Sequence, residues 1–520
     1  MAGSANSDAT PHALVVPSVG QGHVVGAMRL SQSLASLGFK VSFIYFSSYH
    51  AKLKDSNRLV LPSAELRGDT IHGSGSNSTN TAPTMVGTGV YVVGNSSPTV
   101  GLSSSTSGGG HGGGKIFVHV LEDSFEPGDV EKHYFVTAAM KQNLLNLIVK
   151  LREQACPPTC LIVDSFVPWI VDVTERASIP RIEFWTSNAM SHRFVCHLAV
   201  LYSEGIFPEK GSPTLWKRDT PLMLSHIPGL PPFSSELLPS QFRFADLSDH
   251  FVQFFIKVAS CMNSGERILI NSLLELEPAA FKSFEAEGIP AYAIGPLPTD
   301  VLEKKDIGHT ECLSWLDLQA ESSVIYVAFG SYATLSAEEV QELAMGLEAS
   351  GSPFLWVIRE DSATILKELP QLTHGKGMII SWAPQVQVLR HKAVGGFLSH
   401  CGWNSTVESL WAGVPILCCP RMAEQRWNCH YLCNVWGAGL ELGRTETGGY
   451  ERSLVDLGVK ALLYNEEGHK ARSKAQEIMH LIERTSTDGG ESFTNLKKFY
   501  EDMRALCSQP SSCSYKSVPV

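Results

Sequence analysis

Short apolar runs and longer helical patterns alternate in the first part of the chain. Residues 13–17 form an apolar run typical of a buried strand, and a glycine-rich turn at 20–23 precedes a helical pattern that ends at Gly38. A second apolar run at 41–46 completes a strand–helix–strand unit. The same order returns at 160–164, 167–177 and 181–185. Because such crossovers join parallel strands, the pattern predicts a parallel sheet covered by helices.

A second series of predicted strands and helices follows later in the chain. The apolar run 324–329 leads into Gly330, and Ser336 with Glu339 then forms a capping box that opens a helix. Further strands are predicted at 354–358, 377–381, 394–398 and 414–418. The sequence therefore predicts an α/β protein of two Rossmann-like β/α/β domains, with the active site between them at the carboxyl ends of the strands.

The predicted domain limits follow from these two series. Residues 1–270 form the first domain and residues 310–490 the second, while 491–520 contain a last helix and a tail. The stretch 271–309 carries four prolines and is predicted to connect the domains. Residues 70–114 contain no Asp, Glu, Lys or Arg and are rich in Gly, Ser, Thr and Asn, which indicates a flexible insert in the first domain. Within it, residues 85–93 are a candidate for a small hairpin.

Composition changes this picture in a few respects. The formal charge of −11 provides no positive field for a phosphate backbone, so a nucleic-acid partner is not expected. The 12 cysteines are scattered over 520 residues and lack the C-x-x-C spacing of zinc or redox sites, so we interpret them as buried, reduced thiols. The N-terminus lacks a basic segment before an apolar one, and no apolar run is long enough to span a membrane. We therefore expect a cytoplasmic location.

Three other classes of enzyme can be weighed on their motifs. Gly20, Gly22 and Gly26 lie where a dinucleotide fingerprint would lie, which makes a nicotinamide-dependent oxidoreductase an alternative. Their spacing has one residue too many before the last glycine, and the strand at 41–46 is not followed by the acidic residue that would hold a ribose. The chain has no Gly-x-Ser-x-Gly motif for a serine hydrolase, and no Asp-x-Asp pair for a metal-dependent nucleotide-sugar mechanism.

The most specific motif is the segment 382–425, WAPQVQVLRHKAVGGFLSHCGWNSTVESLWAGVPILCCPRMAEQ. It resembles the 44-residue signature box of plant secondary-product UDP-glycosyltransferases, the glycosyltransferase family 1 enzymes. The positions at the family's spacing are Trp382, Pro384, Gln385, His391, 400–405, Glu408, 413–415, Glu424 and Gln425. The resemblance covers almost the whole chain except the insert. It implies the GT-B fold, in which an acceptor domain and a UDP-sugar domain face a cleft and the last helix returns to the first domain.

Physical chemistry supports the resemblance at the expected diphosphate site. After the strand at 394–398, the chain turns into a helix whose first N–H groups are unpaired and positively polarised. His400, Asn404 and Ser405 add side-chain donors there, and Ser331 reaches the phosphates from the opposing strand. These residues form a predicted site for a diphosphate.

Other residues of the box are expected to bind the nucleoside and the sugar. Glu408 can accept hydrogen bonds from both ribose hydroxyls, Trp382 offers a flat face to uracil, and Gln385 can contact the edge of the base. The resemblance also implies donor contacts for Ala383, Trp403, Glu424 and Gln425, the last two with the sugar hydroxyls. In the family, glutamine at the position of Gln425 accompanies UDP-glucose, and some members that use a glucuronate donor have arginine at the position of Trp403.

Catalysis is expected in the first domain. Transfer of a sugar to a hydroxyl needs a base near neutral pH, and the resemblance gives this role to His23, in the turn after the first strand. Asp164, at the end of its strand, would orient the imidazole and stabilise the imidazolium, as in a Ser-His-Asp triad. Thr186 matches a family residue that contacts the donor. Attack opposite UDP would convert the α-linked donor to a β-glucoside.

The sequence thus predicts an inverting, metal-independent O-glucosyltransferase that uses UDP-glucose as co-substrate and acts as a monomer. Family frequency favours a flavonoid or another small phenolic of secondary metabolism as acceptor, and no motif identifies the acceptor-binding residues. UDP-galactose or UDP-xylose remains an alternative donor, and a terpenoid or hormone an alternative acceptor. A nicotinamide-dependent oxidoreductase and a non-catalytic nucleotide-sugar binder remain the alternatives from other classes.

Overall fold

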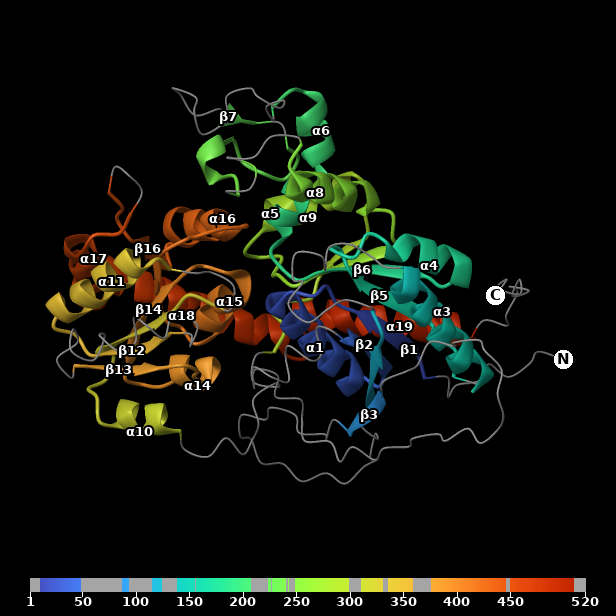
Figure 1. Cartoon of the computed structure of the whole chain (residues 1–520), viewed down its shortest axis with the longest axis horizontal. Coiled ribbons are helices and arrows are strands. Elements are labelled where there is room, and N and C mark those ends of the chain that lie inside the picture. Colours follow the sequence, from blue (N-terminus) through green and yellow to red (C-terminus); the bar gives the residue numbers. More distant parts are fainter. Residues whose placement is uncertain are drawn as a thin grey trace.

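Two α/β units, each built on its own sheet, make up the described part of the chain (Figure 1). The computed structural model describes residues 10–47, 87–92, 115–123, 138–154, 156–206, 223–225, 227–239, 242, 248–298, 310–330, 335–358, 376–445 and 449–508. None of the helices in these ranges is both long enough and apolar enough to cross a membrane. The two predicted β/α/β units are therefore present.

The first sheet has eight strands in the order β10-β9-β6-β5-β1-β2-β4-β3, and all neighbouring pairs except β3–β4 are parallel. Its strands are β1 (His12–Val16), β2 (Lys40–Phe46), β3 (Gly87–Val92), β4 (Lys115–Leu121), β5 (Cys160–Asp164), β6 (Arg181–Trp185), β9 (Arg267–Ile270) and β10 (Ala291–Ala293). β1 lies between β2 and β5, so the strand order reverses there. Such a switch point leaves a crevice at the carboxyl ends of the strands.

Helices cover both faces of this sheet because its central strands are apolar on both sides. Ala13 and Val15 of β1 pack with α1 and α19, while Leu14 and Val16 pack with α3 and α4. The helices of this unit are α1 (Gln21–Ser36), α3 (Ala138–Glu153), α4 (Ile170–Ala177), α5 (Ala189–Cys196), α6 (Leu198–Ser203), α8 (His250–Cys261) and α9 (Pro278–Ala286). A short hairpin, β7 (Met223–Leu224) and β8 (Phe233–Ser234), and the 3₁₀ turn Ser235–Leu237 complete it.

Two segments differ from the sequence prediction. Residues 87–92, inside the predicted insert 70–114, form the single strand β3, which pairs antiparallel with β4 instead of folding into a hairpin of its own. The rest of that insert lies outside the described residues. The predicted connection 271–309 contains α9 and β10, and β10 is a strand of the first sheet, so the chain leaves that sheet later than its prolines indicate.

The second sheet has six parallel strands in the order β13-β12-β11-β14-β15-β16, and its switch point lies between β11 and β14. Its strands are β11 (Val324–Ala328), β12 (Phe354–Val357), β13 (Gly377–Ile380), β14 (Val394–Ser399), β15 (Ile416–Cys418) and β16 (Gly439–Glu441). The helices are α10 (Glu311–Asp317), α11 (Ala337–Ala349), α14 (Gln385–Leu389), α15 (Trp403–Trp411), α16 (Gln425–His430), the π-helical turn η6 (Tyr431–Val435), α17 (Arg452–Tyr464) and α18 (Glu466–Ser486). The predicted capping box of Ser336 and Glu339 opens α11.

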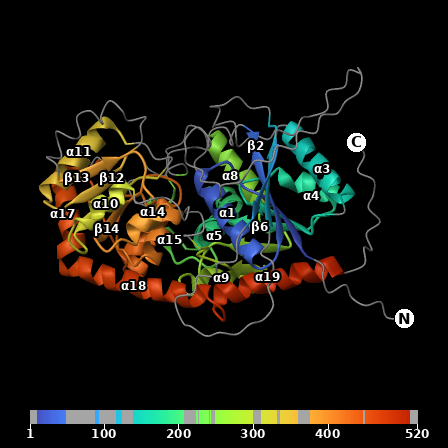
Figure 2. The same ribbon diagram turned by 90° about the horizontal axis from the view of Figure 1, so that it is seen from below.

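A continuous apolar cluster joins the two units. Phe233 of the first unit and Trp427 of the second meet edge to face, with ring centroids 4.3 Å apart. The indole N–H of Trp403 donates to the carbonyl of Asn271 at 2.8 Å, again from one unit to the other. Figure 2 shows α18 leading into the last helix, α19 (Glu491–Ser508), which runs below the first unit. The relative position of the two sheets is thus held by packing as well as by the chain.

α19 binds the first unit through a buried apolar face. Phe499 is fully buried and stacks on Phe39, with 5.8 Å between ring centroids, and Ser492 donates to the carbonyl of Gly295 at 2.6 Å.

Phe499→Ala would leave a cavity between α19 and the first unit, and we expect it to lower the stability of the protein by about 3–5 kcal/mol. The measurement is the midpoint of urea unfolding, compared with that of Lys497→Ala, an exposed position of the same helix. Equal midpoints for both variants would contradict this packing.

Candidate active site

His23 and Asp164 come together at the switch point of the first sheet. His23 lies in the first turn of α1, directly after β1, and Asp164 is the last residue of the neighbouring strand β5. Nδ1 of His23 lies 2.7 Å from Oδ2 of Asp164. The other oxygen, Oδ1, accepts the backbone N–H of Phe166 at 2.9 Å. Because both oxygens are engaged, the carboxylate is fixed and holds the imidazole in one orientation.

The surroundings of His23 favour its protonated form. Burial alone would lower the pKa of His23, but the charge of Asp164 and the hydrogen bond to it act in the opposite direction, with a further contribution from Glu424. The pKa of His23 is therefore raised. The side chain of Asp164 is 1% exposed and that of His23 is 28% exposed, so the imidazole remains accessible from the cleft.

The second unit contributes an uncapped helix end opposite α1. α15 starts after Gly402, which gives no side-chain cap, and α1 likewise starts after Gly20 without one. The side-chain amide of Asn404, in the first turn of α15, donates to the carbonyl of Gly22 at 3.0 Å. Two positively polarised helix N-termini therefore meet in the cleft, an arrangement that favours an anion between them.

His400 lies in the turn before α15 between two glycines. A Cβ atom at Gly330 or at Gly402 would lie 2.7 Å or 2.5 Å from its Nε2, so only glycine leaves room for the imidazole. Burial lowers the pKa of His400 to about 4, against the opposing effect of a hydrogen bond to the carbonyl of Ala328. The ring is therefore neutral at pH 7. Nδ1 of His400 and Oδ1 of Asn404 are buried and have no hydrogen-bond partner among the described residues, as expected for groups that await a ligand.

Glu408 forms a buried ion pair with the first unit. Its Oε1 accepts from Nη2 of Arg29 of α1 at 2.5 Å, and the two side chains are 7% and 4% exposed. Its Oε2 accepts from Nε2 of Gln385 at 2.6 Å, and the same amide group lies 3.1 Å from Oγ of Ser405. Nε and Nη1 of Arg29 have no partner within the described residues. Charges and polar groups from both units thus converge beside the first turns of α15.

The start and the end of the signature box 382–425 also lie at the cleft between the two units. Trp382, after β13, is 45% exposed, whereas Ala383 beside it is buried. Oε1 of Gln425 accepts the backbone N–H groups of Arg421 and Met422, both at 2.8 Å, which turns the amide nitrogen of Gln425 away from that loop. Glu424 acts on His23 through its charge and lies 3.4 Å from Oγ of Ser187. The end of the box and the His23–Asp164 pair are therefore neighbours across the cleft.

Comparison with known proteins identifies the family. The model of the family "UDP-glucoronosyl and UDP-glucosyl transferase" matches residues 294–451. UDP-glycosyltransferase 85A3 of Arabidopsis thaliana is 32% identical over 517 residues, with 95% of this chain and 96% of that protein covered. The chain belongs to the plant UDP-glycosyltransferases. A further relative, the 7-deoxyloganetin glucosyltransferase of Catharanthus roseus, is 30% identical over 96% of this chain and 97% of its own.

A solved structure supports the fold of this UDP-glycosyltransferase. Phytolacca americana UGT2, complexed with UDP-2fluoro-glucose and pterostilbene, superposes with a TM-score of 0.72 and 27% identity, with 95% of this chain and 100% of that chain covered. The GT-B prediction is confirmed. Membership of this enzyme family also decides against the nicotinamide-dependent oxidoreductase and the non-catalytic binder.

Some predicted residues of the glycosyltransferase lie differently from their expected roles. The indole of Trp403 is 3% exposed and engaged with Asn271, so its side chain packs between the units and gives no support to a donor contact. Oγ1 of Thr186 lies 3.3 Å from Nδ1 of His23, beside the catalytic pair, and its contact with the donor stays a prediction. Ser331 lies outside the described residues. His391 binds Asp317 and the N–H of Ala393, which fits an anchoring role before β14.

Sequence reasoning about the glycosyltransferase did not single out Arg29. The sequence feature that could have indicated it is a charged residue with apolar neighbours on the same helix. These neighbours, Ala27, Met28 and Leu30, are buried in the structure. A buried charge of this kind needs a partner, but the partner, Glu408, lies 379 positions away and no local pattern connects the two. The pair is a product of the closed arrangement of the two units.

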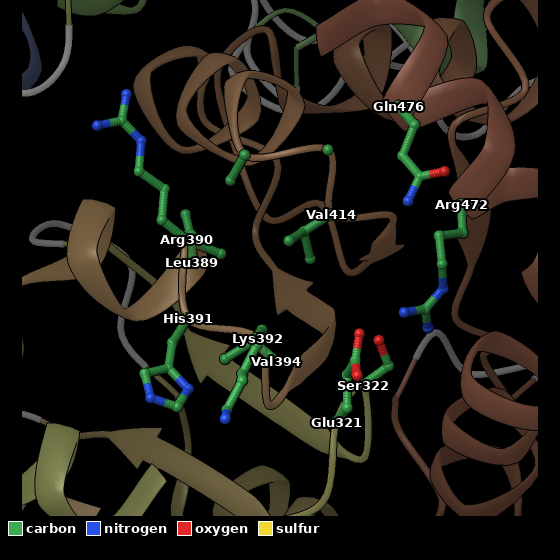
Figure 3. A pocket seen from close by; sticks show the side chains of 12 residues that line it. Glu321, Ser322, Leu389, Arg390, His391, Lys392, Val394, Val414, Arg472 and Gln476 are labelled. Carbon is green, nitrogen blue, oxygen red and sulfur yellow. The ribbon is translucent and has the colours of Figure 1, made fainter. Parts of the chain in front are cut away.

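A separate small cavity of about 170 Å³ lies at the other end of β14, where Val394 begins the strand (Figure 3). Arg472 and Gln476 reach it from α18, while Arg390 directs its guanidinium group away from it. Arg472 also donates to the carbonyl of Gly395 at 2.7 Å. The positive groups around this cavity do not converge on one point, and it lies apart from the cleft of the glycosyltransferase.

The Asp164–His23 contact predicts a measurable titration. In Asp164→Asn the negative charge is lost while the side chain keeps its shape, so we expect the pKa of His23 to fall. As a base, His23 is active only when neutral, so the acidic limb of any pH–rate profile should move to lower pH in this variant. NMR titration of histidine-labelled protein, with the His23 signal assigned through His23→Gln, measures the shift. Asp172→Asn, which removes an exposed carboxylate of α4 paired with Lys141, is the matched control. An unchanged titration in Asp164→Asn would disprove the assignment.

The Arg29–Glu408 pair predicts a stability effect. Arg29→Met leaves the Glu408 carboxylate buried without its counter-charge, so we expect a loss of about 3 kcal/mol, seen as a lower midpoint of urea unfolding. The double variant Arg29→Met/Glu408→Gln should recover part of this loss because no unpaired charge remains. Arg452→Met removes a partner from a more exposed pair with Glu342, with side chains 44% and 23% exposed, and should lower the unfolding midpoint much less. Additive effects of Arg29→Met and Glu408→Gln would show that the two side chains do not interact.

Proposed function

We propose that this enzyme transfers glucose from UDP-glucose to a hydroxyl group of a small lipophilic acceptor, with inversion at the anomeric carbon. The observation that carries the proposal is the His23–Asp164 pair, which faces Glu424 across the cleft beside the uncapped N-terminus of α15. A base and an anion site are thereby brought together on two different units.

The arrangement supports a direct displacement. Asp164 and Thr186 both lie against Nδ1 of His23, so Nε2 is left for the acceptor hydroxyl. Nε2 takes the hydroxyl proton as the acceptor oxygen forms its bond to the anomeric carbon, and Asp164 stabilises the resulting imidazolium. The bond from that carbon to the UDP oxygen breaks, and its electron pair leaves with the diphosphate. Attack opposite UDP converts an α-linked donor to a β-glucoside.

The N-terminus of α15 is suited to stabilise the departing diphosphate. Its first N–H groups and the dipole of the helix act on negative charge that develops on the leaving oxygen. Arg29 has two unpaired guanidinium nitrogens close to the same turns and adds positive charge. We propose on this basis that transfer proceeds without a metal ion. Trp382, half exposed at the rim, is proposed to stack on uracil, and Glu408 to bind the ribose hydroxyls.

The end of the signature box favours glucose as the transferred sugar. Two backbone N–H groups hold Oε1 of Gln425, so its amide nitrogen is oriented as a donor toward a sugar hydroxyl. Together with glutamine being the residue type that accompanies UDP-glucose in the family, this supports the glucose proposal. UDP-galactose and UDP-xylose are the donors to compare with it.

Aromatic side chains next to His23 support a lipophilic acceptor. Phe166 meets the His23 ring edge to face at 4.9 Å and stacks on Trp185 at 5.4 Å. Phe254 and Phe255 of α8 extend this surface, with ring centroids 6.3 Å and 5.2 Å from Phe166. Flat, apolar acceptors gain most from such a wall, which agrees with a flavonoid or another phenolic. Terpenoid and hormone acceptors remain alternatives, and the monomeric state and cytoplasmic location stay predictions.

The deciding experiment combines a substrate screen with one substitution. Wild-type enzyme is incubated with UDP-glucose, UDP-galactose or UDP-xylose and a panel of phenolic and terpenoid alcohols, and products are identified by mass and by NMR at the anomeric carbon. We expect a β-glucoside of a phenolic from the wild type and a loss of about 10²-fold or more in kcat for His23→Ala, with UDP binding by calorimetry unchanged. His480→Ala, at an exposed histidine of α18, is the control.

The possible outcomes separate the parts of this proposal. Near-normal turnover by His23→Ala would disprove its role as the base. Faster turnover of UDP-galactose or UDP-xylose would overturn the choice of glucose, and an α-linked product would overturn inversion. Turnover of terpenoid alcohols alone would overturn the phenolic acceptor.

A further inference from the structure

Three cysteines of the second unit, Cys418, Cys429 and Cys433, lie together, and a fourth, Cys401, belongs to the turn 400–402 before α15, which we call the donor turn. Cys418 ends β15, Cys429 lies in α16 and Cys433 lies in the π-helical turn η6. The sulfur atoms of these three residues all lie within 4.8 Å of one another, and Sγ of Cys418 and Sγ of Cys433 are 3.7 Å apart. The thiol of Cys401, in the turn between His400 and α15, interacts with those of Cys418 and Cys429.

The burial and spacing of these sulfur atoms suit a metal ion. Cys401 and Cys418 are fully buried, Cys429 is 2% exposed, and Cys433 is half-buried at the edge of the cluster. A tetrahedral zinc ion with Zn–S distances of about 2.3 Å separates its sulfur ligands by about 3.8 Å. The distance from Cys418 to Cys433 already matches this value, and the half-buried Cys433 gives an ion a way in.

The local backbone explains how the ligands converge. Cys429 and Cys433 are four residues apart on a continuous helical segment, so their side chains lie on the same face. A π-helical turn inside such a segment is uncommon and is frequent at functional sites. Cys401 has a positive φ of 63° without being glycine, a conformation that needs support from its surroundings. Both features bring thiols toward the end of β15.

Some groups near these cysteines favour the thiolate form that a metal ion needs, and others favour the thiol form. Arg426 lies close enough to Cys429 for its positive charge to favour a thiolate, whereas the carboxyl group of Glu441 disfavours one. The thiols of Cys401 and Cys418 donate to the carbonyls of Ser399 and Ile416, at 3.5 Å and 3.7 Å. These long contacts are weak, so exchanging them for metal bonds costs little.

We propose that Cys401, Cys418, Cys429 and Cys433 form a thiolate site that binds one zinc ion. The sulfur atoms of Cys418, Cys429 and Cys433 already lie within 4.8 Å of one another, and the thiol of Cys401, which lies outside that group of three but interacts with two of its members, supplies the fourth ligand. The ion would clamp the donor turn, through Cys401, to the segment that follows Glu424 and Gln425. It touches neither the sugar nor the acceptor, so this site is separate from the transfer step and its role is structural. The proposal does not depend on the proposed donor or acceptor.

The first test uses the whole wild-type chain. Protein purified under reducing conditions is incubated with Zn²⁺, freed of excess metal by gel filtration, and analysed for zinc by mass spectrometry. We expect about one zinc ion per chain, a lower Tm after treatment with a chelator, and thiolate-to-cobalt absorption when Co²⁺ replaces zinc. Wild-type protein that retains no zinc would overturn the proposal, whatever the variants do.

Variants then assign the ligands. Cys433→Ser, at the half-buried position, and Cys429→Ser/Cys433→Ser should lose the zinc and the cobalt absorption. Cys419→Ser is the matched control, because Cys419 is adjacent to Cys418 and equally buried but packs in the cluster on the other face of the sheet. Zinc retained by Cys429→Ser/Cys433→Ser, or lost equally in Cys419→Ser, would overturn the assignment. A Cys418–Cys433 disulfide in protein alkylated at the moment of lysis would overturn it in favour of a redox pair.

Discussion

Contact between the carboxyl edges of two sheets is the constraint on which the site depends. The proposed base, His23, lies on the first unit and the proposed anion-binding turn before α15 lies on the second, so neither unit alone contains the complete proposed site. The apolar cluster around Phe233 and Trp427 and the bond from Trp403 to Asn271 hold these edges together. Parallel strands direct the loops that follow them to one edge, which is why two such sheets can place their carboxyl edges opposite each other.

The electrostatics of the cleft follow from the same contact between the two units. Two uncapped helix N-termini are brought face to face, and Arg29 adds a buried positive charge that Glu408 offsets. The carboxylate of Glu408 compensates only part of the positive charge that Arg29 and the two helix N-termini bring together. A nucleotide diphosphate is the complementary ligand, and its entry would give acceptors to the buried Nε and Nη1 of Arg29 and to an N–H at Nδ1 of His400.

Local sequence patterns predicted much of the fold and the pairing of His23 with Asp164, whose catalytic role stays a prediction. The apolar runs before His23 and before Asp164 became the adjacent parallel strands β1 and β5, and strands of that kind place the residues at their ends side by side. The connection at 271–309 was predicted less well, because its prolines are compatible with the helix α9, where Pro278 occupies the first position. In the same way, a tryptophan at position 403 matches the family pattern whether its indole faces a ligand or packs between the units.

The sequence by itself determined the family and the two-sheet architecture and predicted the donor box and the base, because each depends on residue types at short, fixed spacings. Only the tertiary structure decided which distant groups meet. The Arg29–Glu408 pair and the aromatic wall at Phe166 join segments separated by many residues, and the cysteine cluster joins the end of a strand, a helix and a π-helical turn. Such contacts depend on how sheets and helices pack across the cleft and beneath it, and periodicity along one segment carries no information about the segment that will face it.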